Sequence, residues 1–344
     1  MPEHPSVSVN IVVRNGARYI RHCLDAVRAQ TYAGISAVVL DNASTDGTPD
    51  IVAREYPECR LIRHSENVGM WPGQELLLAV TRSTYVLSLS VDVVLAPDFV
   101  RHAVAACTGD PAVGAVQGKL YQYDIDDLYR DGPSSLRHGR IDTCGFAMTR
   151  ARKVLNIRHG ESDDAWTSAP HELFGVEGAV PFFRRSALED CRIGGRIWDP
   201  DFFWYGDDLD LAWRMHVFGH RQVFVPDAIA WHDRSTTKGV ASDIAGHLSR
   251  IAVRRRIPLT KRRLDWSNVR FTIIKNDYIM NILRDLPWIL GREIATFAYT
   301  VFFEPRAFAE AGRFVRMLPR MLRRRRLVMQ RAVIGTSEFH RWFI

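Results

Sequence analysis

The sequence predicts an α/β protein whose central sheet is mixed but mainly parallel, with helices on both faces. Two observations carry this prediction. Strand-like runs alternate with segments of helical spacing along the first ninety residues, which is typical of strands joined by helical crossovers. Most of these runs are apolar, as in a sheet that is covered on both faces. The expected strands are 7–13, 36–40, 60–63 and 85–89, and the expected helices are 17–30, 48–56 and 74–81.

The pattern continues less regularly through the rest of the chain. Residues 122–172 are polar and weakly periodic, so we expect a long connecting region with a hairpin around 141–156. From about residue 240 onward the spacing is helical. The other expected elements are helices at 98–109, 186–191 and 207–218 and strands at 112–121, 179–183 and 221–225, with His232 in the loop that follows.

Charge divides the chain into an acidic body and a basic tail. Residues 251–344 contain 20 Lys and Arg against 7 Asp and Glu, whereas the other 250 residues contain 26 basic and 32 acidic side chains. We therefore expect a main domain over 1–240 and a helical, basic extension over 241–344. A basic tail favours an anionic partner such as a membrane surface.

The cysteines and the apolar segments bear on the cellular compartment. The five cysteines are isolated and odd in number, which argues against a disulfide framework and against a zinc site and favours a reducing cytoplasm. The first residues lack the pattern of a signal peptide, and no apolar run reaches the roughly 18–20 residues of a spanning helix. We expect a cytoplasmic protein held peripherally on the inner face of the cell membrane.

The segment D-N-A-S-T-D-G-T at 41–48 follows an expected strand end, where α/β sheets bind ligands. The carboxylate of Asp41 is suited to accept a hydrogen bond from the imide N–H of uracil or thymine. Asn42 and Ser44 form a tight turn beside it. Alone, the segment is explained equally well as a simple turn between a strand and a helix.

Asp92, in S-V-D at 90–92, also follows an expected strand end. Its carboxylate suits Mg²⁺ or Mn²⁺, and such an ion stabilises the charge that develops on a diphosphate leaving group. Without the other motifs, an ordinary loop acid is the better interpretation.

Two adjacent acids, Asp207 and Asp208, follow an aromatic run and open an expected helix. Carboxylates are stabilised by the dipole at a helix N-terminus, so a capping cluster explains them fully. An acid at the start of a helix beside aromatic residues is also well placed to act as a general base. The two roles are compatible.

In this order and spacing, these segments and W-H-D at 231–233 resemble glycosyltransferase family 2, in particular its bacterial rhamnosyltransferase-like members. The resemblance covers residues 6–235 and implies a GT-A fold, with a nucleotide-binding half at 1–121 and an acceptor and catalytic half at 122–240. It implies inverting transfer of a sugar, rhamnose or a similar one, from a dTDP or UDP sugar. The implied acceptor is a hydroxyl of a cell-envelope polysaccharide or of a lipid-linked glycan.

The resemblance also implies roles for single residues. Asp208 is the base, and Asp207 shapes the acceptor pocket or raises the basicity of Asp208. Asp92 and His232 hold the divalent metal, Mg²⁺ or Mn²⁺, with weaker help from Ser90, which stands where the family has a first acid. The implied nucleotide and donor contacts are Asn15, Asp41, Asn42, Ser44, Asn67, Gly69, Val91 and Asp92, and the residues implied at the acceptor or donor sugar are Gly178, Ala179 and Trp204.

The tail alternates apolar segments with basic ones, as does a helix that lies in a membrane interface. Its arginines include 313, 316, 320 and 323–326, and each is worth about 1 kcal/mol near an anionic leaflet. The alternatives are an extension that packs on the body and a contact in a homodimer.

Three rival functions are weighed against this interpretation. An oxidoreductase that binds a dinucleotide needs G-x-G-x-x-G after the first strand, where the chain has V-R-N-G-A-R. A catalytically inactive, glycosyltransferase-like membrane scaffold fits Ser90 and Arg14, and hydrolysis of a nucleotide sugar would separate it from an enzyme. No recognised nucleic-acid-binding module accompanies the arginines, so we expect no nucleic-acid partner.

Overall fold

The computed structural model describes residues 4–163, 169–202, 205–234 and 258–344. Its centre is a mixed sheet with the order β10-β12-β6-β11-β4-β1-β2-β3, in which β5 also pairs with β12 and β7 with β6. The strands of this sheet are β1 (Val7–Val13), β2 (Ile35–Asn42), β3 (Arg60–His64), β4 (Tyr85–Leu89), β5 (Val93–Leu95), β6 (Val113–Gln122), β7 (Ile141–Thr143), β10 (His171–Glu172), β11 (Phe182–Arg184) and β12 (Arg221–His232).

The first four strands are parallel to one another, whereas β11 runs antiparallel to both of its neighbours, β4 and β6. All of β1 is buried because alternate side chains enter two cores. Ile11 lies in the core of α1 (Ile20–Arg28), α2 (Thr48–Glu55) and α4 (Phe99–Gly109). Val12 packs on the other face against Leu77 of α3 (Met70–Val80).

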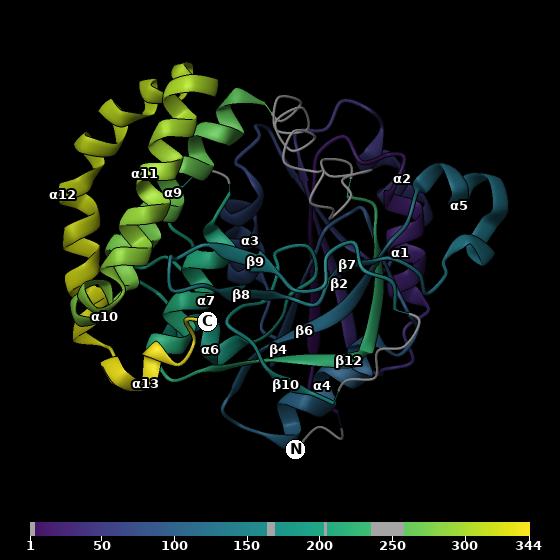
Figure 1. The fold of residues 1–344 in the computed structure, drawn as a ribbon. Coiled ribbons are helices and arrows are strands. Elements are labelled where there is room, and N and C mark those ends of the chain that lie inside the picture. The colour runs from purple at the N-terminus through teal and green to yellow at the C-terminus, as the bar shows by residue number, and fades with distance from the viewer. Residues whose placement is uncertain (1–3, 164–168, 203–204, 235–257) are drawn as a thin grey trace.

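The face of the sheet that carries α3 also carries α6 (Arg185–Asp190) and α7 (Asp207–Val217), with the C-terminal helices outside them (Figure 1). Val328 and Phe339, near the end of the chain, are buried in the same core as Trp213 of α7. The C-terminal helices are α9 (Leu259–Asn276), α10 (Ile279–Arg284), α11 (Leu286–Phe303), α12 (Ala309–Gln330) and α13 (Thr336–His340). Within the described ranges, none of the helices has the length and apolar character to cross a membrane.

Smaller elements fill the connecting region. Helix α5 (Ile125–Asp131) and a 3₁₀ turn (Gly132–Ser135) follow β6, and a second 3₁₀ turn (Pro305–Phe308) joins α11 to α12. Strands β8 (Phe146–Met148) and β9 (Val154–Asn156) pair antiparallel, so the expected hairpin is present. The α/β class, the mainly parallel sheet and the helical C-terminal region are confirmed.

Three expected boundaries were wrong. Strand β2 continues to Asn42, because its register with β3 extends to that residue, so Asp41 lies inside the strand rather than beyond it. Strand β11 contains only the residues that pair with β4 and β6, which leaves Gly178 and Ala179 ahead of it. Strand β12 continues through His232, because pairing with β5 and β6 extends it past the expected end at 225.

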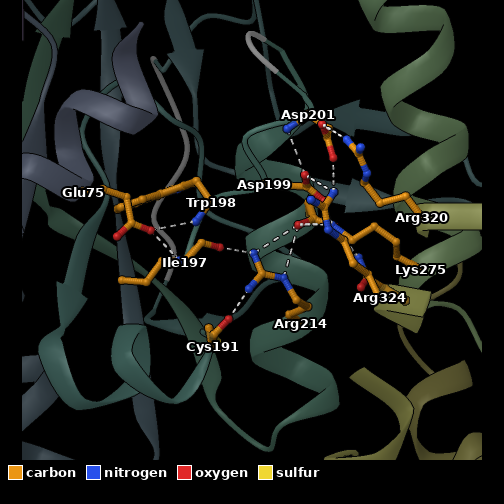
Figure 2. Close-up of polar contacts among 12 residues, drawn as sticks. Glu75, Cys191, Ile197, Trp198, Asp199, Asp201, Arg214, Lys275, Arg320 and Arg324 are labelled. Carbon is orange, nitrogen blue, oxygen red and sulfur yellow. Dashed lines mark hydrogen bonds and ion pairs between the residues drawn. The ribbon is translucent and has the colours of Figure 1, made fainter. Parts of the chain in front are cut away.

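A buried ionic cluster joins α7 to α9. Asp210 is fully buried and accepts hydrogen bonds from Lys275 Nζ at 3.0 Å, Arg214 Nη2 at 3.1 Å and Asn276 Nδ2 at 2.8 Å. Figure 2 shows Arg214 and Lys275 among the polar groups that connect the loop at 197–201 to the C-terminal helices. Because Asp210 lies in the first turn of α7, this cluster fixes the end of the helix that carries Asp207 and Asp208.

Replacement of Asp210 by Asn is expected to lower the free energy of unfolding by about 3 kcal/mol, because it leaves buried cations with too little negative charge. Urea denaturation followed by circular dichroism measures this change. Asp126→Asn is the control, since Asp126 pairs with Arg18 at an exposed position and its loss should cost about 1 kcal/mol or less. Equal losses in the two variants would show that the buried cluster does not hold α7.

Candidate active site

The carboxyl ends of β1 and β2 meet in a polar cluster of loops. The backbone N–H of Asn15 donates to Ser44 Oγ at 2.9 Å, and the backbone N–H of Thr45 donates to Asn15 Oδ1 at 2.8 Å. Asp41 is buried beneath them and accepts a hydrogen bond from the backbone N–H of Ser44 at 3.3 Å. These contacts place Asp41, which is expected to bind the base of the nucleotide, next to the turn that contains Ser44.

Asn42 connects this cluster to the segment before α3. Its Nδ2 donates to Asn67 Oδ1 at 2.8 Å, and the backbone N–H of Gly69 donates to the same oxygen at 3.0 Å. A Cβ atom placed on Gly16 would lie 3.2 Å from a methyl group of Val91, so Val91 borders the same loops. The structure thus brings together Asn15, Asp41, Asn42, Ser44, Asn67, Gly69 and Val91.

Asp92 and His232 face each other beside this cluster. The register of β12 against β5 sets His232 opposite Val93, and His232 Nε2 lies 3.6 Å from Asp92 Oδ2. The hydroxyl of Ser90 donates a hydrogen bond to Asp92 Oδ1. Ser90 therefore positions the carboxylate of Asp92 through a direct contact.

Asp142, which sequence reasoning did not select, holds the ring of His232. The distance between His232 Nδ1 and Asp142 Oδ2 is 2.8 Å, which leaves Nε2 directed at Asp92. Burial opposes a charge on the ring, but hydrogen bonds and charges from Asp142 and Asp92 raise the pKa of His232 to about 10. A carboxylate behind a histidine is also the usual second partner of a metal ligand. The available signal was an acid, Asp142, within a strand that is buried throughout.

The donor atoms of this site fit a divalent cation. A carboxylate and an imidazole nitrogen converge, and Mn²⁺ accepts both ligand types. Within the described residues, no group of three or more His, Cys, Asp and Glu side chains is arranged to hold a metal. Asp92 and His232 would therefore hold an ion together with water or with oxygens of a bound diphosphate, as is common for Mg²⁺ sites.

A line of charged contacts leads from this site toward α7. Arg234 Nε lies 3.0 Å from Asp142 Oδ1, and Arg234 Nη2 lies 2.8 Å from Glu177 Oε1. Glu177 Oε2 accepts a hydrogen bond from the backbone N–H of Ala179 at 2.8 Å, and the carbonyl of Ala179 accepts one from the backbone N–H of Ser90 at 2.8 Å. The loop that contains Ala179 therefore connects the Asp92 side of the site to the Asp208 side.

Asp208 lies half-buried at the start of α7 and beside this loop. A Cβ atom on Gly178 would lie 3.4 Å from Asp208 Oδ2 and 3.1 Å from the ring of Trp71, so the backbone of Gly178 lies close to both side chains. Burial, followed by the negative charge of Glu177, raises the pKa of Asp208 to about 6, against the opposing effect of backbone hydrogen bonds such as that from Leu209. A carboxylate with this pKa is ionised at neutral pH and is a stronger base than an exposed aspartate.

Asp207 has a different environment. It is buried, and within the described residues its Oδ2 has no hydrogen-bond partner. Burial, followed by the charges of Asp208 and Asp210, raises its pKa well above the ordinary value, which favours the neutral carboxyl.

The residue whose charge acts most on the pKa of Asp208 is Glu177, which the sequence did not single out. Trp204 lies outside the described residues.

Comparison with known proteins identifies the same family that the sequence motifs resemble. The sequence model of Glycosyl transferase family 2 matches residues 8–190, which is more than half of the chain. A curated relative, N-acetylglucosaminyl-diphospho-decaprenol L-rhamnosyltransferase of Mycobacterium tuberculosis, is 26% identical over 250 residues. The match covers 67% of this chain and 77% of the relative.

Solved structures show the same fold at low sequence identity. A mannosyltransferase from Pyrobaculum calidifontis, in complex with GDP-Man and Mn²⁺, aligns with 98% of this chain and 88% of its own, with a TM-score of 0.52 and 19% identity. TarS from S. aureus aligns with 97% of this chain and 89% of its own, with a TM-score of 0.56 and 14% identity. On its sequence and its GT-A architecture, the chain belongs to glycosyltransferase family 2.

Proposed function

We propose that the protein is an inverting glycosyltransferase in which Asp208 is the general base. The observation that carries this proposal is the environment of Asp208, which is a half-buried carboxylate at a helix start with a pKa of about 6. It lies close to the backbone of Gly178, in the loop that connects this side of the site to the Asp92 side. Asp207, buried next to it, supports the wall of the acceptor pocket.

In the proposed reaction, Asp208 accepts the proton of the acceptor hydroxyl as the oxygen bonds to the anomeric carbon of the donor sugar. The nucleoside diphosphate leaves from the opposite side, so the anomeric configuration inverts. Asp41 and its loops hold the base of the nucleotide, for which we propose dTDP or UDP. Asp92 and His232 would hold Mg²⁺ or Mn²⁺, and such an ion would supply positive charge to the departing diphosphate.

The donor and acceptor are proposed from the relatives. The mycobacterial relative is named a rhamnosyltransferase that acts on a decaprenol-linked sugar. We propose rhamnose or a similar sugar as the donor residue. A cell-envelope polysaccharide or a lipid-linked glycan is the proposed acceptor.

A lipid-linked acceptor calls for contact with a membrane, and α10 and α11 offer a surface for it. They expose Met280 at 65%, Ile294 at 68% and Phe302 at 77% of their full area, with other large apolar side chains nearby. None of the four acids between residues 279 and 327 is exposed, and each is ion-paired. Exposed arginines in the same segment are Arg284, Arg306, Arg316, Arg320, Arg323 and Arg326.

This surface differs from the one expected from the arginine runs of the tail. Arg313 and Arg324 of α12 contact the loop at 199–201, and Arg325 donates to the carbonyl of Ile274 at 2.8 Å. These arginines help to pack α12 on the body. We propose that the apolar side chains of α10 and α11 enter the interface of an anionic membrane while exposed arginines bind its headgroups.

Asp208→Asn is expected to lower turnover by roughly 10²–10⁴-fold, the usual effect of losing a general base. Stabilisation by dTDP or UDP with Mn²⁺, measured by thermal shift, should be unchanged because the nucleotide contacts are intact. Turnover near that of the unmodified protein would remove Asp208 from this role. Absence of nucleotide stabilisation in the unmodified protein would instead favour an inactive scaffold.

Glu177→Gln is expected to move the acidic limb of the kcat/KM profile to lower pH. The negative charge of Glu177 raises the pKa of Asp208, so its removal lowers that pKa and keeps the base ionised in more acidic solution. The control is Glu189→Gln, because Glu189 of α6 pairs with Arg192 and is not among the groups that shift the pKa of Asp208. A shift to higher pH, or the same shift in both variants, would contradict the role of Glu177.

The double variant Ile294→Ser/Phe302→Ser is expected to lose at least about tenfold in binding to phosphatidylglycerol vesicles, because two apolar side chains no longer enter the bilayer. Flotation measures this binding. Leu76→Ser/Val80→Ser, at two exposed residues of α3, is the control and should float normally. Unchanged flotation of the double variant would contradict the membrane surface. A change from dimer to monomer in size-exclusion chromatography would assign the surface to a homodimer instead.

A further inference from the structure

A groove of about 470 Å³ lies between the loop at 193–200 and helix α12, outside the site described above. This volume is in the range of small-molecule sites. The lining is strongly cationic, with a single acid, Asp199, among the residues that form it. The cationic side chains of the groove are Arg196, Arg214, Lys275, Arg320, Arg323 and Arg324.

Part of this charge is neutralised from within the protein. Lys275 Nζ lies 2.5 Å from Asp199, Arg320 Nη1 lies 2.8 Å from Asp201, and Arg324 Nη1 contacts both of these acids (Figure 2). Arg214 pairs with the buried Asp210. Three carboxylates, Asp199, Asp201 and Asp210, therefore pair with four of the six cations, so the groove keeps a surplus of positive charge.

Two arginines account for much of this surplus. Arg196 and Arg323 are exposed, line the groove from its two sides, and form no ion pair with any described residue. The indole N–H of Trp198, in the wall of the groove, also lacks an acceptor among the described residues although Trp198 is only 3% exposed. The groove thus presents two guanidinium groups that are unpaired among the described residues, and these suit a phosphate-type anion.

The groove lies close to Asp208, the proposed general base. Trp198 stacks on Trp71 with ring centroids 4.9 Å apart, and Trp71 lines the same small cavity as Asp208. Glu75 fixes this arrangement, since its Oε1 accepts hydrogen bonds from the backbone N–H groups of Ile197 at 2.5 Å and Trp198 at 3.3 Å (Figure 2). One stacked pair of indole rings therefore separates the groove from the proposed site of sugar transfer.

We propose that this groove binds the diphosphate of a prenyl-linked acceptor while the sugar of that acceptor reaches Asp208. The inference rests on the proposed function. The donor diphosphate is assigned to Asp92 and His232, so a second diphosphate needs a second set of cations. Leu327 of α12, 44% exposed, lines the groove and gives the first part of a prenyl chain an apolar contact.

The test is titration of the full chain with farnesyl diphosphate, pyrophosphate and farnesol in EDTA, which removes binding through a metal at Asp92. Calorimetry measures the affinities. Farnesyl diphosphate should bind more tightly than pyrophosphate, and Arg196→Gln/Arg323→Gln should weaken its binding by about tenfold or more. Arg284→Gln/Arg326→Gln removes two exposed arginines that do not line the groove and should leave the affinity unchanged.

Equal weakening in both double variants, or in neither, would overturn the proposal. So would equal affinity for farnesyl diphosphate and pyrophosphate, because the ligand would then be a soluble anion rather than a prenyl-linked one. Stabilisation by dTDP or UDP with Mn²⁺ is measured on the same samples. Its absence would contradict the glycosyltransferase function, whereas its retention beside a failed titration would contradict the groove alone.

Discussion

The site depends on how the protein accommodates three acids in one turn of α7. Asp207, Asp208 and Asp210 lie close together in a poorly solvated region, where like charges repel strongly. Lys275 and Arg214 neutralise Asp210, and Asn276 donates a hydrogen bond to it. Burial of Asp207 favours its neutral form. Asp208 is then the acid that remains accessible, beside Gly178. Because Lys275 and Asn276 belong to α9, the C-terminal helices help to position the proposed base.

Paired charges also connect the Asp92 side of the site to the Asp208 side. Acids alternate with basic side chains along a continuous line of contacts formed by Asp92, His232, Asp142, Arg234 and Glu177. The acids on both sides raise the pKa of His232, and a divalent ion bound at Asp92 would take the place of the proton on its Nε2. Glu177 ends this line and raises the pKa of Asp208, so the proposed donor and acceptor sides share one electrostatic network. A change at the Asp92 end, such as loss of the His232 proton, alters the balance of charge that reaches Glu177.

Much of the fold and the identity of the candidate residues could be predicted from the sequence, because strands and crossover helices have distinct periodicities and because Asp41, Asp92 and Asp208 lie in short, ordered motifs. The contacts that support these residues could not be predicted from the sequence. Asp142 is a single acid in a three-residue strand, and Glu177 is a single acid in a loop. They meet His232 and Arg234 only through the pairing of β7 and β12 with β6. The tail was harder still, since its composition indicates basic helices but does not reveal which arginines pair with Asp199 and Asp201 or which apolar side chains stay exposed.

The most direct test of the account is the anomeric configuration of the transferred sugar. The donor is the nucleotide sugar that stabilises the protein most in the presence of Mn²⁺, and the acceptor is a prenyl-diphosphate-linked sugar. Proton NMR of the product gives the configuration at the new linkage. The account predicts inversion, because Asp208 activates the acceptor hydroxyl for a single displacement. Retention of the donor configuration would contradict Asp208 as the base of that displacement and require a different mechanism.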